Sequence, residues 1–91
     1  MSEAGEAQAR ADALLDEYVS QASSSTAAVE LAWLLNRAAT RLHNLARAEA
    51  AARKDQPAWP AWAQLQNAAR GLVLQASTVR DLAGRLPREN A

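Results

Sequence analysis

The chain contains one histidine, and its neighbours offer surroundings that phosphoryl chemistry could use. His43 lies in a stretch with helical spacing of apolar residues, on the side of that helix opposite the main apolar repeat. Arg47 follows one helical turn later. An exposed imidazole can accept a phosphoryl group, and a cation one turn away can hold it. The same position also suits an ordinary surface histidine, so both interpretations stay open.

The segment 41–47, RLHNLAR, resembles the phosphorylated helix of histidine phosphotransfer domains, where an exposed His precedes Leu and a basic residue. The resemblance implies phosphotransfer through His43, with Arg47 close to the phosphoryl group. That family has a Lys-Gly pair where this chain has Ala46 and Arg47. It also uses four helices, whereas three are predicted here.

Other catalytic arrangements find no support in the residue pattern. Asp12, Asp16 and Glu17 fall on the polar side of a predicted helix, as in a solvated face. The chain has no Cys, no second His and no glycine-rich phosphate loop, and it shows no metal-ligand spacing. We therefore expect no enzyme activity, no cofactor and no metal site.

Charge and hydropathy exclude further classes of function. Ten basic residues balance ten acidic ones, so the chain lacks the basic excess expected for nucleic-acid or anionic-membrane binding. No apolar run is long enough to span a bilayer, and the acidic residues 1–6 do not resemble a secretory signal. The expected location is the cytoplasm.

Three apolar repeats with spacings of three and four residues predict three helices, each with one apolar side directed to a core. The repeat of the first helix contains Ala7, Ala11, Leu14 and Tyr18, with Leu15 and Val19 beside it. That of the second contains Leu31, Leu35, Ala38, Leu42, Leu45 and Ala52. That of the third contains Trp62, Leu65, Ala69, Leu72, Ala76, Val79, Ala83 and Leu86.

Helix boundaries follow from capping residues and prolines. The predicted helices span about residues 5–22, 27–53 and 60–86. The Ser/Thr run at 23–26 can cap the second helix, Pro60 suits the first turn of the third, and Pro87 ends it. A turn this short makes the last two helices antiparallel neighbours. The predicted fold is all-α and a single domain over 1–91: an antiparallel helical hairpin with an additional N-terminal helix, forming a three-helix bundle.

Gly71 and Gly84 lie within the third predicted helix and weaken it. They either permit close packing or are merely tolerated. Trp62 is expected to fill the core near the turn, and Trp59 to cap the bundle or stay exposed. Glu49 interrupts the second repeat, where it can reach solvent or pair with Arg70.

A second stripe on the middle helix raises the question of a partner. It includes Val29, Trp33, Asn36, Thr40, His43 and Arg47. Either the first helix folds over it, or Trp33 is exposed and anchors an interface. Leu74 and Leu82 fall off the main stripe of the third helix, while Arg37 and Arg41 either bind anionic groups or cover apolar surface with their stems. The candidate partner-binding residues are Val29, Trp33, Arg37, Arg41, Leu74 and Leu82.

The segment 62–72, WAQLQNAARGL, resembles the second hairpin helix of small co-chaperones of the type III secretion needle subunit. The matching positions are Trp62, Leu65, Gln66, Ala69, Arg70 and Leu72, after a proline-containing turn. The resemblance implies a hairpin that joins a tetratricopeptide-type chaperone and keeps the needle subunit monomeric in the bacterial cytoplasm. The needle subunit itself is also a small hairpin with a proline turn, although its polymerising helix continues to the C-terminus, whereas Pro87 ends this one.

These observations favour a non-enzymatic protein-binding module, such as a small co-chaperone or adaptor. The expected partner is another protein, helical or of the tetratricopeptide type, or a second copy of this chain. Apolar side chains would supply contact area, and Arg37, Arg41 and Arg70 would orient the partner. Two alternatives remain: phosphotransfer through His43 and Arg47, and a self-associating structural bundle.

Overall fold

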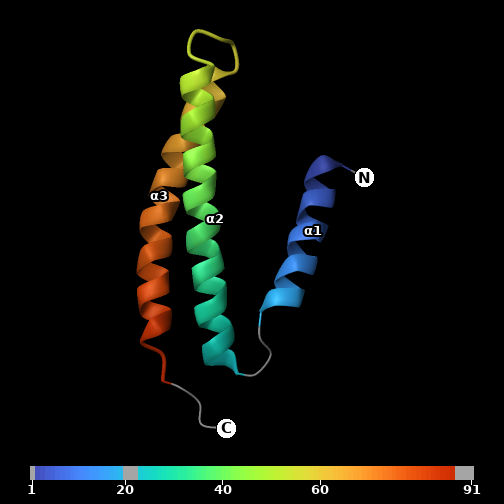
Figure 1. Ribbon diagram of the computed structural model, residues 1–91, viewed down its shortest axis with the longest axis vertical. Helices are drawn as coiled ribbons and strands as arrows, with labels where there is room; N and C mark the ends of the chain where they lie inside the picture. Colours follow the sequence, from blue (N-terminus) through green and yellow to red (C-terminus); the bar gives the residue numbers. More distant parts are fainter. Residues whose placement is uncertain (1, 20–22, 88–91) are drawn as a thin grey trace.

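The fold is all-α, as predicted, and the computed structural model describes residues 2–19 and 23–87 of the chain. Helix α1 spans Glu3–Tyr18, α2 spans Ser24–Ala52 and α3 spans Trp59–Gly84. Figure 1 shows α2 and α3 as a long hairpin, with α1 alongside α2. α1 ends at Tyr18, before the predicted end at 22, and residues 20–22 lie outside the described part.

Short polar side chains begin the first two helices. The Ser2 hydroxyl accepts a hydrogen bond from the Gly5 amide, and the Ser23 hydroxyl accepts one from the Thr26 amide. These bonds satisfy backbone donors that have no partner inside the helix. α3 has no side-chain cap and instead carries Pro60 in its first turn, as the sequence predicts.

The hairpin is antiparallel, and contacts along its length fix the register. At the open end, the Ser25 hydroxyl donates a hydrogen bond to the Pro87 carbonyl oxygen over 2.8 Å. At the turn, the Arg53 guanidinium lies 5.8 Å from the centre of the Trp62 ring. Asp55 reverses the chain with a φ of 75°, in the left-handed region that Asp tolerates better than most residues.

Alanines alone form the buried apolar contact between α2 and α3 in the described residues. We call these residues the alanine seam: Ala32, Ala39, Ala46 and Ala50 of α2, with Ala69, Ala76 and Ala83 of α3. Each is at most 8% exposed. An alanine side chain ends at Cβ, so two helices that meet through alanines can pack with their axes close together.

The seam corrects the predicted core of the middle helix. Leu31, Leu35 and Leu45 were expected to face α3 but are exposed, and the buried residues come from positions that the main repeat does not include. In α3 the prediction is half right, because Ala69, Ala76 and Ala83 are buried, whereas Leu65, Val79 and Leu86 of the same repeat are exposed. The physical reason is that smaller side chains allow the closer helix contact.

α1 makes no packing contact with α2 or α3 among the described residues, and none of its residues is buried. The chain therefore has the three predicted helices and the predicted hairpin, but the expected packing of the first helix against that hairpin is not formed here. Figure 1 shows α1 running antiparallel to α2 and set apart from it. Its apolar stripe stays exposed, including Leu14 and Tyr18.

The two glycines of α3 are tolerated and are not needed for close packing. A Cβ added at Gly71 or Gly84 would meet no atom within 4 Å. The first of the two interpretations from the sequence, close approach of another helix, therefore does not hold within this chain.

Enlarging a seam alanine should destabilise the hairpin. Ala39→Leu is expected to lower the free energy of unfolding by about 1–3 kcal/mol, because the extra atoms must separate α2 from α3. Ala38→Leu is the matched control: Ala38 is the adjacent residue but is exposed, so the free energy of unfolding should change by less than about 0.5 kcal/mol. Urea unfolding followed by circular dichroism measures the free energy of unfolding of both variants. Equal losses would contradict the packing of α2 against α3 through Ala39.

Gly71→Ala should stabilise the chain by up to about 1 kcal/mol, because alanine has the higher helix propensity and its methyl group meets no obstacle. Thermal unfolding by circular dichroism would report a higher Tm. A lower Tm would mean that the glycine has a packing role.

Candidate partner-binding surface

The two sides of the hairpin differ sharply in chemistry. α2 and α3 are right-handed and antiparallel, so residues directly after a seam alanine share one side in both helices, and residues directly before it share the other. Trp33 and Ser77, which each follow a seam alanine, lie on the first side. We call this side the polar face, defined by Trp33, Asn36, Thr40, Ser77 and Arg80.

Hydrogen bonds join the two helices on the polar face. Asn36 is only 5% exposed, and its side-chain amide donates to the Ser77 hydroxyl over 3.2 Å. The Ser77 hydroxyl in turn donates to the Val73 carbonyl oxygen. Because an apolar partner would leave the buried amide unsatisfied, this pair favours the observed register over neighbouring ones.

Trp33 is engaged within the hairpin, although it is still 48% exposed. The Arg80 guanidinium lies 4.8 Å from the centre of its ring, a cation–π arrangement, and Arg80 also pairs with Asp81 over 3.2 Å. The first helix does not cover this tryptophan, because α1 makes no contact with α2 among the described residues. The contact of Trp33 within the hairpin is the Arg80 guanidinium of α3, and the role of an external anchor stays a prediction.

A smaller cluster holds the end of the hairpin near the turn. Glu49 pairs with Arg53 one turn later in its own helix, and the same guanidinium lies over Trp62. Glu49 therefore binds Arg53, and the predicted pair with Arg70 is not the one formed. Trp62 is half-buried and Trp59 is exposed.

The opposite side of the hairpin is aliphatic. The side chains directly before a seam alanine, or one helical turn before it, are mostly leucines. We call this side the leucine face; it comprises Leu31, Leu35, Leu42, Leu45, Leu65, Leu72, Val79, Leu82 and Leu86. Leu42 and Leu72 are half-buried, and the others are exposed, with Leu45 at 52% and Leu82 at 57%.

The leucine face carries little charge. Among the described residues on this side, the charged side chains are Glu49 and Arg53, which neutralise each other near the turn. Contiguous apolar surface of this kind is uncommon on proteins that act alone and is typical of interaction sites. The leucines of the two main repeats thus lie on one surface, but that surface is open.

The predicted partner-binding residues do not form one site. Val29 is half-buried at the open end of the hairpin, where it lines a small pocket of about 260 Å3 with residues such as Ser25 and Leu86. Arg37 and Arg41 are exposed on the side of α2 turned away from α3. Leu74, 68% exposed, lies on the outer side of α3.

Of the predicted set, only Leu82 belongs to the leucine face. Sequence reasoning missed the other leucines because it assigned them to the core. The alanines at 32, 39 and 46, and at 69, 76 and 83, each repeat every seven residues. This second heptad pattern was the available signal for the true seam.

His43 is half-buried on the α3 side of α2, and Arg47 is exposed. The phosphotransfer alternative called for a solvated imidazole, so the geometry does not favour it. Across residues 2–19 and 23–87, no three His, Cys, Asp or Glu side chains gather in a way that could hold a metal ion. Within those same ranges, no helix has the length and hydropathy needed to cross a membrane.

No protein-family model matches the chain, and searches of curated proteins and of solved structures gave no match either. The function is therefore inferred from the surface of the hairpin.

The buried amide on the polar face should contribute measurably to stability. Asn36→Ala is expected to lower the free energy of unfolding by about 1–2 kcal/mol, because the bond to Ser77 is lost and a small cavity forms. Asn44→Ala, an exposed position of the same helix, should change it by less than about 0.5 kcal/mol. Chemical unfolding measures the free energy of unfolding of both variants. An unchanged value for Asn36→Ala would show that its amide does not help to set the register of the hairpin.

Proposed function

We propose that this chain is a non-enzymatic, helical protein-binding module whose leucine face receives an amphipathic helix of a partner protein. One observation carries the proposal: an almost uncharged aliphatic surface runs along both helices of the hairpin and stays exposed. A helix laid along the leucine face would bury its own apolar stripe there, as amphipathic helices do on other apolar surfaces.

The size of the leucine face is sufficient for such an association. Covering a half-exposed aliphatic side chain contributes roughly 1 kcal/mol, and nine of them contribute on the order of 9 kcal/mol. The partner buries matching apolar area, which about doubles the gain. The total exceeds the cost of about 4–15 kcal/mol for lost freedom on association.

Charged side chains at the border would orient the partner. Arg41 is exposed on the outer side of α2, where it can pair with carboxylates of a helix bound to the leucine face. Arg37 lies one helical turn after Trp33 and is therefore closer to the polar face. Arg70 lies on the other side of α3, and contributes only to a partner that reaches around the hairpin. This arrangement favours a partner helix with an acidic border.

The finer proposal is a small co-chaperone or adaptor of the bacterial cytoplasm. It is supported by the resemblance of residues 62–72 to co-chaperones of the type III secretion needle subunit. Leu65 and Leu72, two residues that carry this resemblance, belong to the leucine face, and Ala69 lies in the seam beneath it. In that role the partner is a tetratricopeptide-type chaperone, and the complex shields the needle subunit.

Substitutions on the half of the leucine face near the turn should abolish partner binding. The tagged double variant Leu45→Asp/Leu65→Asp is compared with the unmodified chain in affinity capture from the native host, followed by mass spectrometry. Charges at these positions would have to be desolvated under a partner, so we expect a loss of binding of at least about a hundredfold. Helicity should be retained, because both side chains are exposed.

Leu74→Asp is the control, since this side chain is more exposed but lies away from the leucine face. A partner that is kept by Leu74→Asp and lost by the double variant supports the proposal. The same proteins bound to all three chains would contradict it. Light scattering of the purified chain reports the other possible outcome, in which the leucine face joins two copies.

A further inference from the structure

The zero net charge of the chain conceals two oppositely charged parts. Residues 2–19 contain five acidic side chains and one basic, a net charge of −4. Residues 23–87 contain eight basic and four acidic side chains, a net charge of +4. The acidic part is α1, and the basic part is the hairpin. Opposite charges on two tethered parts attract each other over roughly a Debye length, about 8 Å at physiological ionic strength.

α1 also has an unpartnered apolar stripe of its own. Ala7, Ala11, Leu14 and Tyr18 share one side of the helix, and each is exposed. Glu3, Glu6 and Glu17 lie along one border of this stripe, together with Arg10. Asp12 and Asp16 lie on the opposite, polar side of the helix. α1 therefore has the features that the leucine face requires of a partner, namely an apolar stripe and an acidic border.

We propose that α1 is itself an occupant of the leucine face and closes over the half nearest to the connection through residues 19–23. This inference rests on the proposed function, because it makes α1 a competitor for the surface that the partner uses. Closure adds α1 to the hairpin as a third packed helix, and a partner that covers the whole face must first displace α1.

The lengths of the helices define which half is covered. α1, with 16 residues, is roughly 24 Å long, and α2, with 29 residues, is roughly 43 Å long. The end of α1 is connected to the start of α2, so an antiparallel α1 of this length can reach about as far along α2 as Arg41. The covered residues would be Leu31, Leu35, Val79, Leu82 and Leu86.

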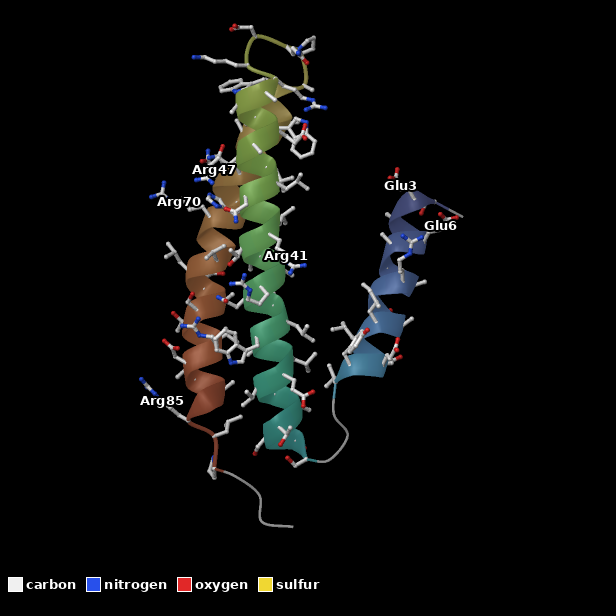
Figure 2. All side chains as sticks on the ribbon, in the orientation of Figure 1. Glu3, Glu6, Arg41, Arg47, Arg70 and Arg85 are labelled. Atoms are coloured by element: carbon white, nitrogen blue, oxygen red, sulfur yellow. The ribbon has the colours of Figure 1, made fainter. Side chains whose placement is uncertain are left out.

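The charged groups at the border agree with this placement. Figure 2 shows the Arg41 side chain on the side of α2 turned toward α1, with Glu3 and Glu6 at the free end of α1. Closure brings these carboxylates close to Arg41. The turn half of the leucine face, with Leu42, Leu45, Leu65 and Leu72, lies beyond the reach of α1 and stays open to a partner.

The absence of cysteine from the chain permits a direct test with introduced pairs. Ala7→Cys/Ala38→Cys places one thiol on the apolar stripe of α1 and the other on the leucine side of α2, at matching heights. Ala7→Cys/Thr40→Cys is the control, since residue 40 lies almost level with residue 38 but on the polar face. A disulfide needs Cα atoms within about 7 Å, so it reports the side on which α1 docks.

Under mild oxidation, we expect the first pair to form an intrachain disulfide roughly tenfold faster than the control pair, because docking raises the local concentration of one thiol at the other. The advantage should shrink at about 1 M salt and in the added variant Arg41→Glu, but not in Arg70→Glu on the opposite side. Equal rates for the two pairs would overturn the proposal. Disulfide-linked dimers of the first pair would overturn it too, by showing that a second copy covers the face.

The outcome is separable from the test of the proposed function. Leu45→Asp/Leu65→Asp alters the half that α1 does not reach, so it should leave the rate of disulfide formation unchanged. Partner binding without closure, or closure without partner binding, would therefore identify which of the two proposals has failed.

Discussion

The close contact of α2 and α3 through alanine determines most of what this chain presents to its surroundings. Alanines at seven-residue spacing bury almost all of their surface and let the two helices meet closely. The leucines next to them in sequence are consequently displaced to one side of the hairpin. An interface through leucine would have buried these side chains, whereas the alanine seam leaves them exposed.

Polar contacts complement the seam, because alanine methyl groups alone specify register poorly. Asn36 and Ser77 meet at one height, Trp33 and Arg80 at another, and Arg53 covers Trp62 beside the turn. The first two pairs lie on the polar face. The polar face therefore holds the contacts that set the register of the hairpin, whereas the leucines of the leucine face stay exposed.

The sequence predicts the three helices, the turn, the capping residues and the antiparallel hairpin, because these depend on local signals such as proline, serine and apolar periodicity. It does not predict the true seam. Leu35 is more hydrophobic than Ala39 and was therefore expected in the core. Ala39 is buried instead, because a small side chain lets the two helices pack closely. The candidate site was missed for the same reason, since a leucine assigned to the core is not considered for a surface. The contact of Trp33 with Arg80 was not predicted, because the two residues are distant in sequence.

Seam and leucine-face positions alternate along the same helices, but the seam positions pack α2 against α3 and the leucine-face positions face outward. Ala38 and Ala39 are neighbours, but one meets solvent and the other meets α3. Substitutions at leucine-face positions can change what the hairpin recognises without disturbing the contact that folds it. The architecture thereby separates the evolution of binding preference from the evolution of stability, and related chains with the same seam could serve different partners.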